Sequence, residues 1–137
     1  MLRHERAVRF EDVDAAGIVF FAHIFSYCHE AMEALFAPLD GGYVKLITER
    51  RLGLPAVRVA ADFTAPLRYG DTAVIEVRVE NVGVTSCTLA YTLTRARDGA
   101  RVATVTHVCV LSDLRTLHKV KIPDDVRAVL EANRVAP

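Results

Sequence analysis

The sequence predicts an α+β fold in which an antiparallel meander sheet wraps around one long central helix. Apolar residues recur at spacings of three and four over about 20–36, which is the period of a helix. After Pro55, apolar and polar residues alternate in successive runs, which is the period of half-buried strands. Because strands and helices are segregated along the chain, the order favours the α+β class.

The first half of the chain is expected to hold one strand and two helices. A short strand is predicted over 5–10, and a turn-rich loop follows around 12–17. The helix over 20–36 has so wide an apolar face that we expect it to be largely buried. The glycines of 40–42 interrupt this pattern, and a shorter helix is predicted over 43–52.

The second half is expected to form four consecutive antiparallel strands and a short final helix. The last strand, 102–111, is apolar on both faces, which is typical of a central or interface strand. Asp98-Gly99 before it is a hairpin signal, and Pro123 suits the first turn of the final helix. The three earlier strands, each with one apolar face, are 57–64, 75–80 and 89–94.

The composition indicates one neutral domain, residues 1–137, that associates with itself. A chain of 137 residues suits a single domain, and a hydrophobic share of 52% excludes disorder. The 17 basic and 17 acidic residues cancel, which excludes a strongly basic protein of nucleic acid or membrane surfaces. We therefore expect no nucleic-acid or membrane partner, and an oligomer, since a net charge near zero favours association.

The cysteines and the amino terminus indicate a cytoplasmic location. Cys28, Cys87 and Cys109 are odd in number and lie far apart in apolar or alternating stretches, as expected of buried thiols in a reducing compartment. The charged start has no apolar segment of a signal peptide, and no run of apolar residues is long enough to span a membrane.

The loop before the long helix carries the most specific chemistry. It runs Phe-Glu-Asp-Val-Asp-Ala-Ala-Gly-Ile-Val-Phe-Phe over 10–21 and holds Asp12 and Asp14. A helix N-terminus offers unpaired N–H groups that stabilise an oxyanion, and a nearby carboxylate is able to attack the carbonyl or activate water. The residues alone leave two interpretations open: an acyl-transfer site that needs no metal or cofactor, or an aspartate that caps a turn or helix.

This motif, continued by Tyr-Cys-His-Glu-Ala over 27–31, resembles the signature of the hotdog-fold thioesterases of the 4-hydroxybenzoyl-CoA thioesterase family, and most of all its aryl-CoA members. A weaker motif, Phe-Thr-Ala-Pro-Leu-Arg-Tyr-Gly-Asp over 63–71, extends the resemblance along nearly the whole chain. The resemblance implies a hotdog fold and hydrolysis of an aromatic acyl-CoA without a cofactor, since coenzyme A is part of the substrate. It also implies a homodimer that builds the active site between its subunits, or a tetramer of paired dimers.

Carried over by position, the resemblance assigns roles to four residues of the loop. Asp14 matches the catalytic carboxylate, as nucleophile or general base. Phe21 lies where the family polarises the thioester carbonyl with a backbone N–H, and Gly17 permits the close turn between them. Asp12 is expected to hold the loop. Some short-chain members have a histidine at the Phe21 position, so Phe21 favours the aryl-CoA branch.

Further residues are candidates for substrate contact. The phosphates of coenzyme A require cations at the mouth of the site, and 115–121 is the densest basic segment outside the amino terminus. Charge runs are more commonly solvated surface, and that alternative stays open. The candidate substrate-binding residues are Ile18, His23, Arg68, Thr85, Ser86, His118 and Lys119.

Other residues of the long helix, and other functions, are alternatives. His29 lacks a second histidine four residues on, where Glu33 stands, so no metal site is expected. Glu30 is either a second reactive carboxylate or a hydrogen-bonded group, and Cys28 lacks a neighbouring base for a nucleophilic role. The alternative functions are hydrolysis of acyl-carrier-protein esters, non-catalytic binding of acyl-CoA, and a dehydratase.

Overall fold

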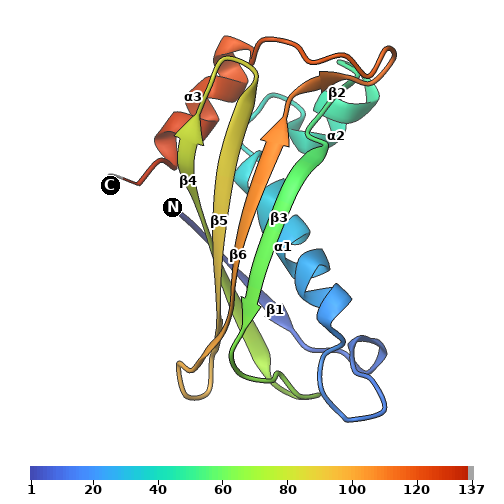
Figure 1. Cartoon of the computed structure of the whole chain (residues 1–137), viewed down its shortest axis with the longest axis vertical. Helices are drawn as coiled ribbons and strands as arrows, with labels where there is room; N and C mark the ends of the chain where they lie inside the picture. The colour runs from blue at the N-terminus through green and yellow to red at the C-terminus, as the bar shows by residue number, and fades with distance from the viewer. Residues whose placement is uncertain (136–137) are drawn as a thin grey trace.

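The computed structural model describes residues 1–135 as a five-stranded antiparallel sheet that curves around one long helix (Figure 1). The strand order is β1-β4-β5-β6-β3, and a small second sheet pairs β2 with β7. This arrangement confirms the predicted α+β hotdog architecture. The strands are β1 (Leu2–Ala7), β2 (Leu52–Gly53), β3 (Ala56–Phe63), β4 (Thr72–Val82), β5 (Ser86–Arg95), β6 (Arg101–Val110) and β7 (Ser112–Asp113). The helices are η1 (Phe10–Asp12, one turn of 3-10 helix), α1 (Phe21–Leu35), α2 (Gly42–Thr48) and α3 (Asp124–Ala132).

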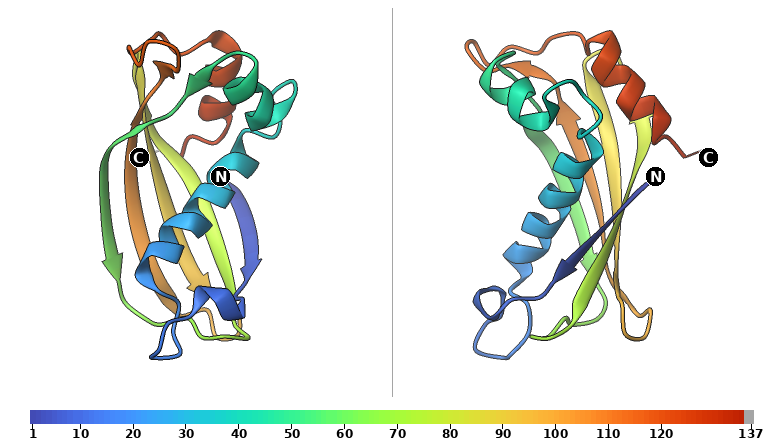
Figure 2. Two further views of the ribbon diagram at one scale, coloured as in Figure 1. Left: turned by 90° about the vertical axis from the view of Figure 1, so that its right-hand side faces the viewer. Right: turned by 180° about the vertical axis from the view of Figure 1, so that it is seen from behind.

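The long helix α1 lies in the concave side of the sheet and crosses its strands (Figure 2). Its inward residues form one buried cluster with the core faces of β4 and β5. Its opposite face is open, because the sheet covers only one side of the helix: Phe21, Ser26 and His29 are exposed. The prediction of a largely buried helix is therefore wrong for a single chain. The buried residues of α1 are Ile24, Tyr27, Cys28, Ala31, Met32 and Leu35.

The sheet differs from the predicted meander of four strands. Only β4, β5 and β6 follow one another as neighbours, whereas β3 pairs with β6 and forms the far edge. The prediction of one buried face on β3 is also wrong, since Val57 is 61% and Phe63 is 49% exposed. The reason is that α1 makes its main sheet contacts with β1 and β4, at the opposite edge. The central position of β6 is as predicted.

Two element boundaries also differ from the expectation. The first strand ends at Ala7 rather than at residue 10, because the Val8 amide donates to the Asp71 carbonyl and the chain then turns into η1. The short helix ends at Thr48 rather than at residue 52, since Arg51 adopts a left-handed conformation (φ 56°) and the following residues pair with β7.

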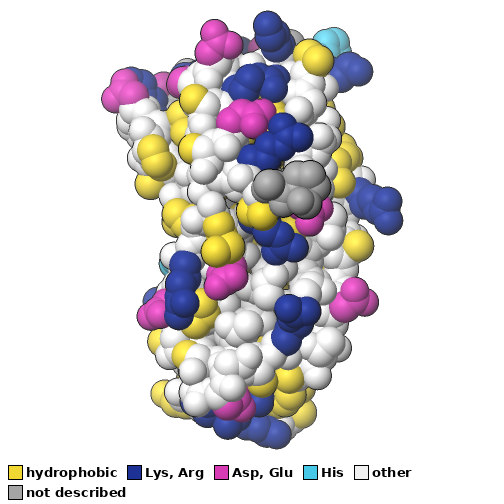
Figure 3. Space-filling model, turned by 90° about the vertical axis from the view of Figure 1, so that its left-hand side faces the viewer, with side chains coloured by type: hydrophobic (Ala, Val, Ile, Leu, Met, Phe, Trp, Pro, Cys, Tyr) yellow, Lys and Arg dark blue, Asp and Glu magenta, His cyan; other side chains and the backbone are white. Residues whose placement is uncertain are grey.

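The remaining features of the fold agree with the composition. All three cysteines are buried and free. Within residues 1–135, none of the helices combines the length and the apolar character needed to cross a bilayer. On the face that includes α3, basic and acidic side chains are interspersed (Figure 3), as expected of a chain with no net charge.

Candidate active site

The segment between β1 and α1 folds into a tight loop around Asp14. Val13 and Val19 pair as an antiparallel bridge. Inside this bridge the Asp14 amide donates to the Ile18 carbonyl at 2.9 Å, and the Gly17 amide donates to the Asp14 carbonyl at 2.9 Å. Gly17 has φ +77°, a conformation that glycine adopts without the steric cost of a side chain. The turn therefore depends on glycine at this position.

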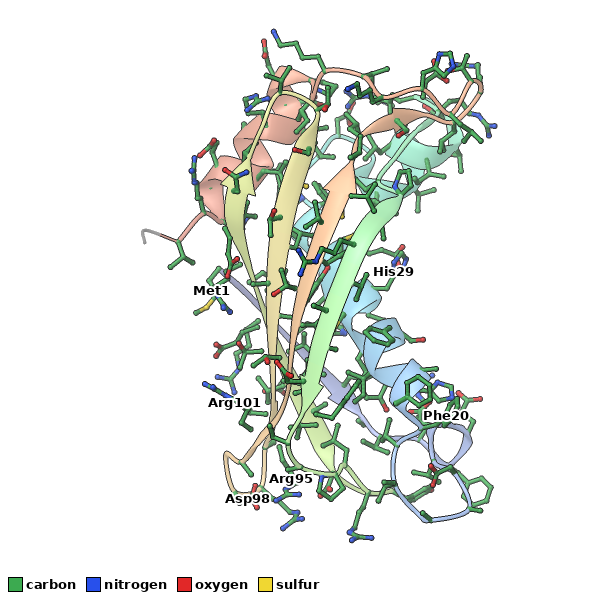
Figure 4. The ribbon with its side chains drawn as sticks, in the orientation of Figure 1. Met1, Phe20, His29, Arg95, Asp98 and Arg101 are labelled. Atoms are coloured by element: carbon green, nitrogen blue, oxygen red, sulfur yellow. The ribbon has the colours of Figure 1, made fainter. Side chains whose placement is uncertain are left out.

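The two sequence motifs meet in space and form one wall. The Val19 amide donates to the Leu67 carbonyl at 2.8 Å, and Ile18 bridges Arg68. The β5–β6 hairpin braces this wall, because Arg95 donates to the Pro66 carbonyl at 2.8 Å and pairs with Asp98. In Figure 4 this hairpin lies at the same end of the molecule as Phe20. Residues far apart in the sequence thus hold the loop in one position.

A pocket of about 580 Å³ lies between the loop and this wall. Asp14, Ile18, Phe21 and Ile24 line one side, and residues 63–67 line the other. Within the described part of the chain, Asp14 is the only ionisable side chain in its lining. The pocket therefore brings together three predicted site residues, Asp14, Ile18 and Phe21. Its other side comes from the weaker motif.

The first turn of α1 borders the same pocket as Asp14. Phe21 is the first residue of the helix, and no side chain caps this end. Amides of a first helical turn have no intrahelical acceptor and carry partial positive charge. The Asp14 carboxylate is exposed, and one of its oxygens accepts a hydrogen bond from the Ala16 amide at 2.8 Å. A carboxylate and a positive helix end thus face one apolar cavity.

Asp12 is a buried anchor beneath the loop. Its carboxylate is 3% exposed and accepts hydrogen bonds from the Tyr27 hydroxyl at 2.7 Å, the Arg9 amide at 2.9 Å and the Arg6 guanidinium at 3.1 Å. Burial opposes its ionisation, but these donors and the charge of Arg6 outweigh burial and hold the pKa of Asp12 below its usual value. The contacts support the expectation that Asp12 holds the loop.

Glu30 belongs to the same structural network. Both of its oxygens lie 3.1 Å from Arg6 Nε, and one lies 3.2 Å from His4 Nε2. Glu30 thereby ties α1 to β1 and does not line the Asp14 pocket. Of the two interpretations weighed for it, the geometry favours the hydrogen-bonded group.

Several other candidates lie outside the pocket. His23 is half-buried, with Nδ1 3.9 Å from an oxygen of Asp12, and Arg68 is exposed beside Ile18. Four others lie at the opposite end of the sheet (Figure 1). There the Thr85 carbonyl accepts from Leu111, and Lys119 bridges Ser112. Within one chain these four do not come together with Asp14: Thr85, Ser86, His118 and Lys119.

Sequence reasoning missed a second cavity, on the other side of Phe25. It has a volume of about 400 Å³, and Cys28, His29, Tyr91 and His107 contribute to its lining. A histidine inside a strand that is apolar on both faces was its only signal. Burial raises the pKa of the Cys28 thiol to about 12, so this thiol is not a nucleophile at neutral pH.

Comparison with protein families and characterised relatives gives one consistent result. A family model described as the thioesterase-like superfamily matches residues 8–130. A 1,4-dihydroxy-2-naphthoyl-CoA hydrolase of Nostoc punctiforme is 33% identical over 131 residues, covering 96% of this chain and 87% of that protein. The protein of the same name from Thermosynechococcus vestitus is 31% identical over 130 residues, covering 94% and 88%.

Solved structures share the fold. A gentisyl-coenzyme A thioesterase superposes with a TM-score of 0.82 at 26% identity, covering 92% of this chain and 99% of its own. A 1,4-dihydroxy-2-naphthoyl-CoA thioesterase from Synechocystis superposes with a TM-score of 0.83, covering 93% of both chains. At 24% identity, the second likeness is one of fold.

Proposed function

Because this chain belongs to the thioesterase-like superfamily, we propose that it hydrolyses an aromatic acyl-CoA thioester to the free acid and coenzyme A. The protein is a thioester hydrolase. The names of its relatives give aromatic CoA esters as their substrates. The observation that carries the proposal is the apolar pocket that Asp14 shares with the first turn of α1.

The proposed reaction needs a carboxylate, a backbone donor and water. The thioester carbonyl oxygen lies toward the Phe21 amide, where the helix end stabilises the negative charge that develops on it. A donor of this kind contributes about 10²–10³-fold in rate. Asp14 attacks the carbonyl carbon or removes a proton from the attacking water. The carbon–sulfur bond breaks, coenzyme A leaves as its thiol after protonation, and no cofactor takes part.

We propose that the site is completed by a second copy of the chain. The outer edge of β3 is free in the described residues, and its side chains are exposed. If two β3 strands pair antiparallel, the end of one subunit that carries Asp14 meets the opposite end of its partner. That opposite end holds residues 85–86 and 115–121. Pairing would therefore supply cations for the phosphates of coenzyme A.

A charge on this edge is expected to break the assembly. Val57→Asp places a carboxylate on a side chain that is 61% exposed on β3, and its burial against a partner is unfavourable. Light scattering should show a dimer or tetramer for the wild type and a monomer with lowered turnover for the variant. Val44→Asp, at a comparably exposed valine of α2 (68%), is the matched control and should keep the assembly. A fully active monomeric wild type would contradict the proposal.

A panel of thioesters tests the proposed function directly. Thiol release is followed with benzoyl-, hydroxybenzoyl-, phenylacetyl-, naphthoyl- and short-chain CoA esters, and with an aryl ester of acyl-carrier protein. We expect kcat/KM for the best aromatic CoA ester to exceed that for short-chain esters by at least about tenfold. The reason is that an aromatic acyl group buries more apolar surface in the pocket than a short chain does. If the carrier-protein ester is preferred, the substrate is an acyl-carrier-protein ester rather than an acyl-CoA. If the esters bind but none is hydrolysed, the protein is a binding module rather than an enzyme.

A further inference from the structure

The second cavity lies next to the Asp14 pocket along α1. Phe25 lines the second cavity, and Phe63 lines the Asp14 pocket. The two rings meet edge to face with centroids 6.3 Å apart, so one pair of rings separates the cavities. Phe25 follows Phe21 by about one helical turn, a rise of about 5.4 Å. An acyl group that starts at the proposed reaction centre would reach the second cavity by passing this pair of rings.

The walls of this cavity are mostly apolar, with polar groups from His29 on α1 and from Tyr91 and His107 on the sheet. Phe25, Val59 and Val105 supply apolar surface. On the sheet the Tyr91 hydroxyl lies 3.2 Å from His107 Nδ1, and the two rings stack with centroids 6.1 Å apart. The other ring nitrogen of His107 lies 3.2 Å from Cys109 Sγ. Both nitrogens of His107 therefore have partners, Tyr91 and Cys109. The Tyr91 oxygen is the atom of this group that is able to form a further hydrogen bond.

The Tyr91 hydroxyl is able to serve as donor or as acceptor. A neutral imidazole has one donor and one acceptor nitrogen. When His107 Nδ1 accepts from Tyr91, the phenolic oxygen is free to accept from a ligand. When Nδ1 carries the proton, the Tyr91 O–H is free to donate. Burial lowers the pKa of His107 and raises that of Tyr91, so both groups stay uncharged near neutral pH. An uncharged two-way partner of this kind suits a hydroxyl group.

The charged groups near the cavity do not offer a site for an anion. His29 projects from α1 beside β3 (Figure 4). Its Nε2 lies 3.4 Å from the Glu33 carboxylate, and both side chains are about half exposed. The Glu33 carboxylate already partners His29 and would repel a second anion beside it. The cavity chemistry thus favours a neutral ring substituent over a carboxylate.

We propose that this cavity receives the distal part of the acyl group, and that the Tyr91–His107 pair selects aromatic rings that carry a hydroxyl group. The inference rests on the proposed function and adds to it the residues that choose the substrate. The ring lies against Phe25 and Val59, and its hydroxyl hydrogen-bonds with Tyr91. An acyl group without the hydroxyl leaves Tyr91 facing apolar surface, which lowers its transition-state affinity.

Tyr91→Phe tests this inference because it removes a single oxygen atom. For the wild type we expect kcat/KM for 4-hydroxybenzoyl-CoA to exceed that for benzoyl-CoA by about tenfold or more. In the variant the ratio should fall to within about threefold of unity, mainly through loss on the hydroxylated ester. Tyr69→Phe, at an exposed tyrosine outside both cavities, is the matched control and should keep the wild-type ratio.

A binding measurement separates this inference from the proposed function. Ligand-observed NMR compares 4-hydroxybenzoate with benzoate on the wild type and on Tyr91→Phe, and it needs no hydrolysis. If no CoA ester is hydrolysed but the hydroxylated acid binds better in a Tyr91-dependent way, the proposed function fails and the selective cavity stands. If hydrolysis proceeds and neither assay shows a preference for the hydroxyl, or the preference survives in Tyr91→Phe, the inference is overturned and the thioesterase stands.

Discussion

Asp14→Asn is expected to lower kcat for an aryl-CoA ester by about 10²–10⁴-fold, the usual contribution of a positioned acid–base group. KM should stay within about threefold, since the amide keeps the size of the carboxylate. The amide oxygen also retains the hydrogen bond from the Ala16 amide, which spans 2.8 Å in the wild type. The loop should therefore keep its shape while the reactive group is lost. Steady-state thiol release measures both constants, and thermal unfolding confirms that the variant is folded.

A matched control separates a role in the reaction from a loss of negative charge. Glu11 lies in η1 of the same loop and is exposed. Glu11→Gln removes one charge from the loop without touching the pocket, and its kcat should stay near the wild-type value. Turnover by Asp14→Asn close to that of Glu11→Gln would remove Asp14 from the proposed mechanism.

Isotope labelling tests for the nucleophilic role of Asp14. In a single turnover in ¹⁸O-water, a nucleophilic carboxylate forms an anhydride with the acyl group, and water that attacks the Asp14 carbon leaves label in the enzyme. A general base activates water directly, so label enters only the released acid. Label found by mass spectrometry in the peptide that contains Asp14 would identify the nucleophilic role.

Asp12→Ala is expected to lower the free energy of unfolding by about 3–5 kcal/mol, the cost of removing one partner from a buried ion pair. The substitution leaves the Tyr27 hydroxyl and the Arg9 amide without their acceptor and removes one of two carboxylates from Arg6. Urea unfolding measures the loss. Glu11→Ala, one residue away and exposed, should change stability by less than about 0.5 kcal/mol. Equal effects of the two substitutions would contradict the anchoring role of Asp12.

The same carboxylate makes stability depend on pH. The folded protein holds the pKa of Asp12 below its ordinary value near 3.8, so the unfolded chain binds its proton more readily. Its contribution is therefore fully present above that ordinary value and is lost as pH falls through the lower, folded pKa. The difference in unfolding free energy between wild type and Asp12→Asn should be constant near neutral pH and shrink below about pH 4. If the difference in unfolding free energy instead grew at low pH, the lowered pKa of Asp12 in the folded protein would be contradicted.

The loop also illustrates how far a site can be predicted from a sequence. Asp14, Ile18 and Phe21 were predicted as site residues, and they line one pocket. The anchoring of Asp12 by Arg6 and Tyr27 was not predicted in detail, because these residues belong to β1, the loop and α1. Local sequence reports the turn, whereas hydrogen bonds between elements depend on how the elements pack.

The sequence by itself determined the local features of this protein. The helical period over 20–36 located α1 almost to the residue. Alternation located β4 and β5 within a few residues, and a run that is apolar on both faces located β6. Gly17 marked the turn, which requires a positive φ at this position. These features follow from interactions within a few residues, since hydrophobic period and turn chemistry act along the chain.

Only the tertiary structure decided which distant segments meet. It placed β3 beside β6 with an open edge, which no alternating pattern specifies. It placed the segment 115–121 at the opposite end of the sheet from the loop before α1 (Figure 1), and it joined Tyr91 to His107 across two strands. Strand order and register depend on long-range pairing and on the packing of one whole face against α1. The single chain therefore carries the proposed reaction centre at one end of the sheet and the candidate phosphate-binding cations at the other.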